Sequence, residues 1–224
     1  MSRPIAVLRP EPGNRVTAAA IEARGRSAIR LPLFAARALA WEPPPAERFD
    51  ALILTSANAL RHGGTGLAAL WPLPVHAVGE ATAEAARRSG FEVAATGDSG
   101  SAALLARAEA AGVRRALHLA GRERSIAAGG IVAEVIPVYA SEALEIAPAD
   151  VARLAGSVAL VQSARAGRRL GELVDSTRIG RETIALVAVS PAAAQAAGAG
   201  WANVLVSPAV RGEALIEAAI ALAD

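Results

Sequence analysis

Several residue types that carry enzyme chemistry are missing from this sequence of 224 residues. It has no cysteine, which excludes a disulfide framework, a cysteine-ligated metal or cluster, and a thiolate nucleophile. It also has no lysine, so a Schiff-base lysine and a GxxxxGK[ST] phosphate-binding loop are excluded as well. The three histidines, His62, His76 and His118, are scattered along the chain. We therefore expect no metal site.

The scarcity of titratable groups also explains an unusual charge balance. All 23 basic residues are arginine, there are 21 acidic residues and one tyrosine, and the formal net charge is only +2. The isoelectric point of about 10.2 is high because almost nothing titrates between neutrality and pH 10. This value does not indicate a basic patch, and we expect no nucleic-acid partner.

Long apolar runs are absent too. The longest stretch without a charged residue, 183–210, is interrupted by Pro191 and Pro208, so no membrane-spanning helix fits there. Pro4 and Arg9 lie where a signal peptide would need an unbroken apolar segment. We expect a cytoplasmic protein without a membrane partner.

The apolar residues that are present form short continuous runs. Such runs are typical of strands buried on both faces, as in parallel sheets. They lie at 5–8, 28–33, 51–54, 75–78, 116–119, 132–138, 158–161, 184–189 and 204–206. Helical segments are expected between them, at 81–88, 101–111, 167–174 and 212–223, and one that Asn14 caps and Gly25 ends. Regular alternation of strands and helices predicts an α/β fold.

Two segments interrupt this alternation, 35–50, with its three consecutive prolines, and 140–150. An internal repeat explains the division, because VHAVGEATAEAA in the middle of the chain is similar to ALVAVSPAAAQAA nearer its end. Ser56 then corresponds to Ser163, and Gly79 to Ser190.

The repeat predicts two similar open parallel-sheet domains, flavodoxin-like or Rossmann-like. We expect a discontinuous first domain of residues 1–34 and 151–224 and a second domain of residues 46–138, with linkers at 35–45 and 139–150. A chain that crosses twice between two such domains predicts a hinged interdomain cleft for a ligand.

Small and hydroxylic residues follow the strands of both halves, where parallel sheets bind ligands. Ser56, Thr82, Ser163 and Ser190 can each be simple helix caps. Their recurrence at matching positions favours a shared anionic ligand, since helix N-termini and arginine bind carboxylates or phosphates.

Few other residues suggest acid–base chemistry. Glu80 and Asp98 are possible acids, although Asp98 is also placed to cap a helix. Arg122 and Arg124 can bind an anion or pair with Glu123 or Glu134 on the surface.

The single tyrosine, Tyr139, ends a predicted strand where the chain leaves the second domain. Its repeat counterpart is Phe34, so the ring has a packing precedent, whereas the hydroxyl does not. Packing at the domain edge and proton donation into the cleft remain open alternatives.

Taken in order, VLRPEPG, ALILTSANAL, VHAVGEATAEAARRSGF, GDSGSAALL, VIPVYAS, VALVQSARA and ALVAVSPAAAQAA resemble the uroporphyrinogen-III synthase family over nearly the whole chain. The resemblance implies two α/β domains joined by a two-stranded linker, with the active site between them. It implies cyclisation of hydroxymethylbilane, a linear tetrapyrrole, with inversion of ring D and loss of water in haem biosynthesis. The resemblance implies no metal and no cofactor. It implies a monomer, which can make a transient contact with the deaminase that acts one step earlier.

The resemblance also assigns residues. Tyr139 lies at the position of the family's favoured proton donor to the leaving hydroxyl. Carboxylates of the substrate would be bound by turns and arginines. The resemblance assigns Arg9, Ser56 and Thr82 to this role, and the turns that follow the strands add Ala57, Asn58, Gly79, Arg122, Ser163 and Ser190.

This chain departs from the family pattern at two places. Ala193 stands where the family often has a hydroxyl, and the segment 121–130 is shorter than the family's usual helix there. The residues alone also fit a different class of protein, a non-catalytic hinged binding module for an anionic small molecule. Tyr139 and the turns at Ser56 and Thr82 distinguish the enzyme from that module.

Overall fold

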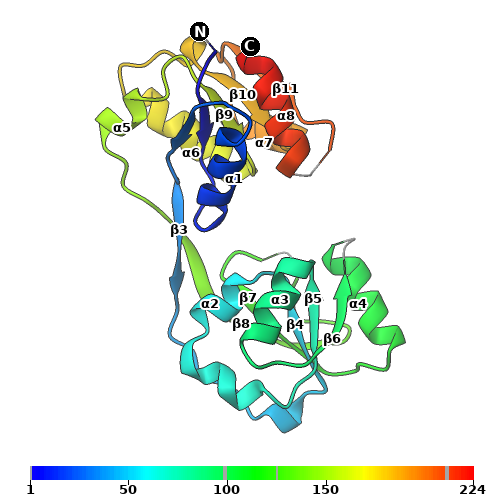
Figure 1. The fold of residues 1–224 in the computed structure, drawn as a ribbon. Helices are drawn as coiled ribbons and strands as arrows, with labels where there is room; N and C mark the ends of the chain where they lie inside the picture. The colour runs from blue at the N-terminus through cyan, green and yellow to red at the C-terminus, as the bar shows by residue number, and fades with distance from the viewer. Residues whose placement is uncertain (1, 98–99, 125, 210–211) are drawn as a thin grey trace. The chain divides into compact units, whose positions relative to one another are not determined.

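The computed structural model describes residues 2–97, 100–124, 126–209 and 212–224. The chain divides into two compact units, Met1–Ala35 with Ala143–Asp224 as unit 1 and Ala36–Glu142 as unit 2. Each unit is built on its own sheet, and both boundaries between the units fall within strands (Figure 1).

Unit 1 contains a five-stranded sheet in the order β11-β10-β9-β1-β2, in which all neighbouring strands are parallel. The strands are β1 (Ile5–Val7), β2 (Ala28–Arg30), β9 (Val158–Val161), β10 (Ala185–Ala188) and β11 (Asn203–Val206). The helices are α1 (Gly13–Glu22), α5 (Pro148–Ala152), α6 (Ala164–Asp175), α7 (Pro191–Ala197) and α8 (Gly212–Ala223), with a 3₁₀ turn η3 (Arg181–Thr183).

Unit 2 contains a six-stranded sheet in the order β3-β8-β7-β4-β5-β6. The strands are β3 (Phe34–Ala38), β4 (Ala51–Leu54), β5 (Val75–Val78), β6 (Val93–Gly97), β7 (Ala116–Gly121) and β8 (Val132–Ala143). The helices are α2 (Asn58–His62), α3 (Glu80–Arg88) and α4 (Ser101–Ala110), with 3₁₀ segments η1 (Ala46–Arg48) and η2 (Gly64–Leu70).

The central strands form because their side chains are apolar on both faces. Every residue of β4, β9 and β10 is buried. In unit 1, α5, α6 and α7 cover one face of the sheet and α1 and α8 cover the other. In unit 2, α2, α3 and η2 cover one face and α4 covers the opposite face. These buried layers confirm the predicted α/β class with parallel sheets.

The strand orders of the two sheets agree with the internal repeat. The order β11-β10-β9-β1-β2 in unit 1 corresponds, strand for strand, to β6-β5-β4-β7-β8 in unit 2. The first strand of the chain pairs with β9, so the N-terminal segment completes the sheet of the C-terminal block. The turns that follow corresponding strands therefore occupy equivalent places in the two units.

The two crossings are more regular than the sequence suggests. We predicted that Tyr139 ends its strand, but β8 continues to Ala143. The adjoining segment Phe34–Ala38, most of which we assigned to a linker, forms strand β3 beside β8. Residues 140–143 contain no proline or glycine, so nothing in them stops a strand that has a neighbour to pair with.

One predicted helix cap is wrong. Helix α1 begins at Gly13 with Pro12 as its N-cap residue. The Asn14 side chain is fully buried and its amide donates to the carbonyl oxygens of Val7, at 2.7 Å, and Arg9, at 3.1 Å. Asn14 therefore does not cap the helix, and its hydrogen bonds connect the start of α1 to β1 and to the turn that follows it.

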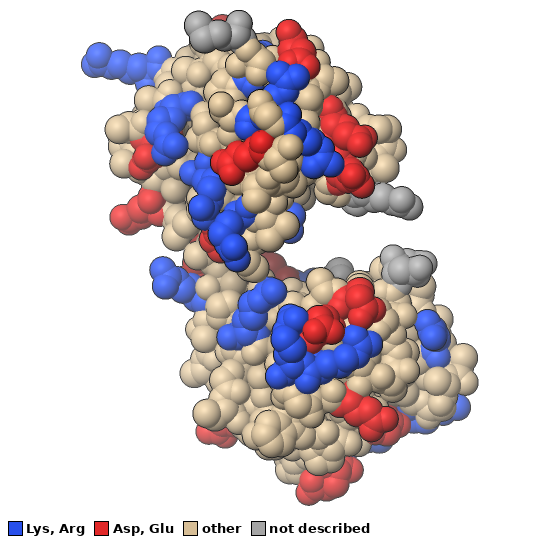
Figure 2. Space-filling view, in the orientation of Figure 1, with Lys and Arg blue, Asp and Glu red and all other residues tan. Residues whose placement is uncertain are grey.

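Charged side chains of both signs are interspersed on the face drawn in Figure 2. On α3, Arg87 pairs with Glu80 at 2.7 Å and with Glu84 at 3.6 Å, and Arg88 pairs with Glu84 at 3.1 Å. The possible acid Glu80 is thus one partner of an exposed ion pair, and Asp98 lies outside the described residues. Among the helices described, none is long and apolar enough to cross a membrane.

Glycine lets α6 and α7 approach each other closely. A Cβ atom added at Gly167 would lie 2.6 Å from the Ala193 carbonyl oxygen, and one at Gly171 would lie 3.0 Å from that of Ala197. Backbone contacts cannot be relieved by rotating a side chain, so position 167 requires glycine, and a side chain at 171 would force the Ala197 carbonyl to shift.

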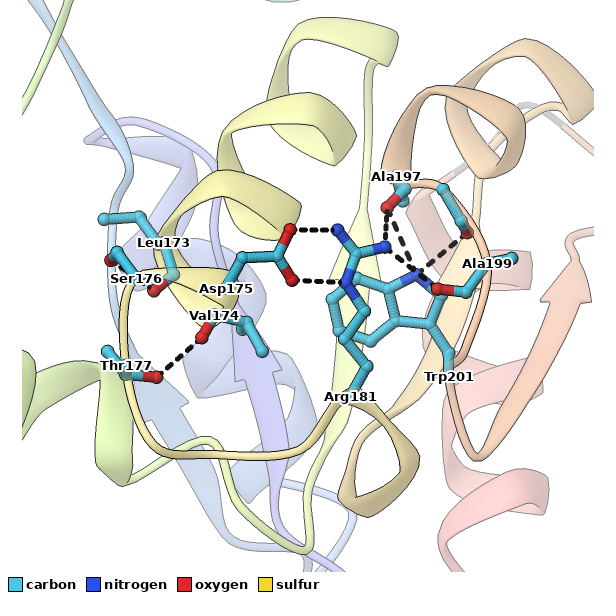
Figure 3. A network of polar contacts seen from close by, with 10 residues as sticks. Leu173, Val174, Asp175, Ser176, Thr177, Arg181, Ala197, Ala199 and Trp201 are labelled. Atoms are coloured by element: carbon cyan, nitrogen blue, oxygen red, sulfur yellow. Dashed lines mark hydrogen bonds and ion pairs between the residues drawn. The ribbon is translucent and has the colours of Figure 1, made fainter.

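Arg181 closes the end of the same helix pair (Figure 3). Its guanidinium donates two hydrogen bonds of 2.7 Å to Asp175 and two more to the carbonyl oxygens of Ala197, at 3.0 Å, and Ala199, at 2.9 Å. It also stacks 4.9 Å from the Trp201 ring. One cation therefore satisfies carbonyl groups left open at the C-terminus of α7 and joins them to α6.

Replacing Arg181 by alanine should destabilise unit 1 by about 2 kcal/mol, because the Ala199 carbonyl oxygen and the indole face lose their partner, while the Ala197 carbonyl oxygen retains the 3.2 Å hydrogen bond from the Trp201 indole. Urea unfolding followed by circular dichroism measures the loss. The exposed Arg153, which pairs with Asp150 at 3.5 Å, is the matched control, and R153A should change stability by less than about 0.5 kcal/mol. Equal effects of R181A and R153A would contradict this account of Arg181.

Candidate functional site

A cavity of about 330 Å³ lies at the carboxyl edge of the sheet of unit 2. Strands β4, β5 and β7 are parallel and end at this edge, so the residues that follow them meet there. The lining residues are Thr55, Ser56, Val78, Ser101, Gly121, Glu123, Arg124 and Tyr139. Two of the residues predicted to form the site, Ser56 and Tyr139, are therefore in one cavity.

The backbone of β7 and β8 places Tyr139. In the register of these parallel strands Gly121 is the partner of Tyr139, directly after a register shift between Ala120 and Gly121. The Arg122 N–H donates to the Tyr139 carbonyl oxygen at 2.8 Å and fixes the end of the ladder. A Cβ atom at Gly121 would lie 2.9 to 3.0 Å from the tyrosine ring and hydroxyl oxygen. The ring thus lies directly over a residue that has no side chain.

The Tyr139 side chain is half-buried, and its ring centroid lies 6.1 Å from that of His62. Among the described residues, the phenol hydroxyl has no hydrogen-bond partner. A hydroxyl held by its ring at the wall of a cavity, and not used by the protein, can donate to a ligand.

Two neighbouring residues that sequence reasoning missed support the floor of the cavity. Thr55 lines it, and its Oγ1 lies 3.4 Å from Nε2 of His118 on β7. His118 is fully buried, and its Nδ1 has no partner in the described part of the chain. Burial, with a smaller contribution from the nearby Arg124 charge, lowers the pKa of His118 to about 4. His118 is therefore a neutral group below the cavity at physiological pH.

The turn after β4 is held by its own serine. Ser56 Oγ accepts the Asn58 N–H at 3.2 Å, and the Asn58 side chain accepts from Arg61 at 3.0 Å. Ala57 is buried and precedes α2 as its N-cap residue. Ser56 is the member of this predicted trio that lines the cavity.

Gly79 and Thr82 lie at the start of α3 but not in the lining of the cavity. Gly79 is the N-cap residue, with φ of +77°, and its N–H donates to the Gly97 carbonyl oxygen at 2.6 Å. Thr82 is buried inside the first turn, so it is not the helix cap that we considered as an alternative. Glycine is required at position 79 because the left-handed conformation is strained for other residues.

Of the two arginines that follow β7, the structure places Arg124 in the cavity lining, and Arg122 is exposed outside it. Arg124 donates to the Arg122 carbonyl oxygen at 2.9 Å. Glu134, which we considered as a surface partner of these arginines, is paired instead with Arg48 at 3.1 Å. The sequence alone does not show which of Arg122 and Arg124 faces the cavity, because side chains in an irregular loop do not alternate with a fixed period as they do in a strand or helix.

In unit 1, Arg9 follows β1 and lies against Gly13, where a Cβ atom would overlap its guanidinium. Its Nη1 reaches Thr17 Oγ1 at only 3.5 Å, and the side chain is exposed. Arg9 therefore offers a cation at the carboxyl edge of this sheet, positioned by a glycine.

Ser163 and Ser190 follow β9 and β10 and cap the next helices. Ser163 Oγ accepts the Ala166 N–H at 3.1 Å, and Ser190 Oγ accepts the Ala193 N–H at 3.3 Å. The interpretation as caps is confirmed for these two serines. Ligand binding by either of them stays a prediction.

His118 makes the stability of unit 2 depend on pH. Its folded pKa of about 4 lies below the ordinary value of 6.5, so the unfolded chain binds more protons between these values. The stabilisation is complete above pH 6.5 and is lost as the pH falls toward 4. Relative to an H118Q variant, the wild type should lose about 2 kcal/mol of unfolding free energy between pH 7 and pH 5.

Urea unfolding of the wild type and H118Q at both pH values measures this difference, and NMR titration of the His118 ring locates its pKa directly. A ring pKa near 6.5, or parallel pH dependence of the two proteins, would show that His118 is not desolvated.

Known proteins resemble this chain in sequence pattern and in fold. The uroporphyrinogen-III synthase HemD family model matches residues 15–217. The uroporphyrinogen-III synthetase structure from Helicobacter pylori is similar with a TM-score of 0.67 and 18% identity, over 99% of this chain and 100% of that chain. A mutant uroporphyrinogen III synthase from Thermus thermophilus has a TM-score of 0.50 and 16% identity, over 99% of each chain.

No curated protein sequence matches this chain. At identities of 16 and 18%, the solved structures establish the fold alone. The family is established by the sequence model, which spans all but the two ends of the chain. This chain belongs to the uroporphyrinogen-III synthase HemD family.

Proposed function

We propose that this chain cyclises hydroxymethylbilane to uroporphyrinogen III, with inversion of ring D and loss of water. The family match supports the reaction. The observation that carries the mechanism is the Tyr139 hydroxyl, which has no partner among the described residues and stands in a cavity with the hydroxyls of Thr55, Ser56 and Ser101.

The proposed first step is protonation of the leaving hydroxyl. The Tyr139 O–H donates its proton, the carbon–oxygen bond breaks, and water leaves an azafulvene cation. Glu123 lines the same cavity, and its negative charge favours the developing cation. The phenol is placed by packing against Gly121, so no reorganisation is needed at the moment of transfer.

The remaining steps conserve atoms. The substituted carbon of ring D attacks the cation and gives a spiro intermediate. The bond that joined ring D to the neighbouring ring then breaks, and ring D is joined again in the inverted orientation. The last proton lost from the ring carbon restores the Tyr139 hydroxyl, so water is the only by-product. The reaction consists of proton transfers, one carbon–oxygen cleavage and carbon–carbon bond changes, and none of these steps changes the overall oxidation state of the substrate.

A tetrapyrrole is far larger than this cavity, whose 330 Å³ corresponds to about a dozen water molecules. We propose that the cavity holds the reacting end of the bilane and that Arg124 binds a carboxylate of that end. Further carboxylates are assigned to Arg9, Ser163 and Ser190 of unit 1, and to Asn58, Gly79, Thr82 and Arg122 of unit 2. We assign a further contact with the same substrate to Ala57.

We further propose a cytoplasmic monomer without a metal or cofactor. Hydroxymethylbilane closes spontaneously to the type I isomer, so rapid delivery is an advantage. A transient contact with the deaminase that makes the bilane would provide it.

The direct test supplies the purified protein with freshly made hydroxymethylbilane and measures the isomers formed. The type III isomer should exceed the spontaneous type I product. An unchanged isomer ratio would contradict the proposal and favour a binding module instead.

Replacing Tyr139 by phenylalanine should lower kcat by about 10²-fold or more with little change in KM, because the ring still packs but the proton donor is lost. Initial rates of type III formation measure both constants. Circular dichroism should match the wild type. Full activity of Y139F would assign the proton to water or to a substrate carboxylate.

Replacing Gly121 by alanine should move the Tyr139 ring, since the new methyl group would overlap it at 2.9 to 3.0 Å. We expect kcat to fall about 10-fold or more, as for a misplaced catalytic group. Gly212, where a Cβ atom meets nothing within 4 Å, provides the control variant G212A. Wild-type kcat in G121A would show that packing on Gly121 does not position the phenol.

A further inference from the structure

A second cavity lies at the opposite edge of the sheet of unit 2. It has a volume of about 400 Å³, within the range of small-molecule sites. Its walls include Asp50, Pro74 and Val113, which stand immediately before β4, before β5 and near the start of β7. Asp50 and Thr55 are separated by the whole of β4, about 16 Å along the strand. The second cavity is therefore distinct from the proposed site of the reaction.

The cavity exists because small residues leave a groove unfilled. The pairing of β5 with β6 is irregular, since Val75 pairs with Val93 and His76 pairs with Ala95, which leaves Ala94 out of register. Such irregularities re-aim side chains at the edges of sheets. Ala111 at the end of α4 has too short a side chain to close the groove from the other side.

His76 forms part of the cavity wall without a partner. Its side chain is only 4% exposed, and its Nδ1 has no hydrogen bond in the described part of the chain. Burial lowers the pKa of His76, so the imidazole is neutral and offers one donor and one acceptor. This Nδ1 atom is itself buried from solvent, so only the other ring nitrogen can serve a partner from outside the chain.

Two opposite charges accompany this imidazole. Arg107 donates only to the Thr96 carbonyl oxygen, at 3.2 Å, and has no ion pair among the described residues. The Asp50 carboxylate accepts the N–H groups of Arg114, at 2.7 Å, and Arg115, at 3.1 Å, which leaves further lone pairs open. Arg107 lowers the pKa of His76 and Asp50 raises it, so both charges act on the same ring.

A ligand that matches this wall must carry both charges and an apolar body. A ligand with only a negative charge would be repelled by the Asp50 carboxylate. A ligand with only a positive charge would be repelled by the Arg107 guanidinium. Pro74, Ala95 and Val113 supply the apolar part of the wall.

We propose that this cavity binds a small zwitterion, an α-amino acid with a short aliphatic side chain. Its carboxylate pairs with Arg107, its ammonium group pairs with Asp50, and its side chain lies against Pro74 and Val113. His76 completes the hydrogen bonds of the bound amino acid. The proposal is independent of the reaction at the other edge of the sheet.

The test uses the ring signals of the three histidines in NMR spectra of the full chain, with His76 assigned by its loss in H76Q. Titration with L-leucine should give a saturable shift of the His76 signal and leave His62 unchanged. R107Q should weaken the affinity about 10-fold or more, and D50N should do the same. R88Q, which alters an exposed arginine on α3, should bind like the wild type.

Butyrate and n-butylamine, which carry one charge each, should bind at least about 10-fold more weakly than L-leucine. The groove-filling variant A111L should abolish the shift, and unchanged His62 and His118 signals would show that each variant is folded. No saturable shift with L-leucine, or equal affinity in wild type and R107Q, would overturn the proposal. If butyrate bound as tightly as L-leucine, the proposal of a zwitterionic ligand would be wrong and the cavity would be a simple anion site.

Discussion

The contact between Tyr139 and Gly121 is the constraint on which the candidate site depends. These residues are register partners on β8 and β7, and the ring rests where position 121 has no side chain. The register shift just before Gly121 fixes this pairing. Because β7 also ends beside β4, the same register brings the hydroxyls of Thr55 and Ser56 to one cavity with the phenol. The sheet determines the position of the reactive group, and the loops add charge around it.

The composition of the chain is consistent with chemistry of this kind. Without cysteine or lysine, the groups available for catalysis are hydroxyls, carboxylates, arginines and neutral histidines. Loss of water from a bilane requires a proton donor and a surface that tolerates a cation, and the cavity holds a phenol and a carboxylate. His118 is kept neutral by burial, so it adds no positive charge beneath the developing cation.

Much of the fold could be predicted from the sequence because buried parallel strands are continuous apolar runs. The strands at 51–54, 75–78 and 158–161 have the predicted bounds. β3 and the end of β8 could not be predicted, because the alanines and glutamate in these segments favour helix over strand, and the strands form only where the two segments pair. Asn14 was misplaced for a related reason, since its partners, Val7 and Arg9, belong to the preceding strand and turn. The domain boundaries that we drew from the repeat stay a prediction.

The candidate site was only partly predictable. Tyr139 was found because its hydroxyl has no counterpart in the repeat, and Ser56 was found because it follows a strand. Both residues line the cavity. Thr55, Ser101 and Gly121 have no sequence signal that separates a cavity wall from an ordinary strand end. Thr82 and Arg122 were assigned by resemblance, and their part in binding depends on how a large substrate extends beyond this cavity.

The most direct measurement is a crystal structure of the wild type with its tetrapyrrole product bound. The account predicts that the Tyr139 hydroxyl oxygen lies about 3.5 Å from the methylene carbon that carried the leaving hydroxyl. A product bound with that carbon away from Tyr139 would contradict the assignment of this residue as the proton donor.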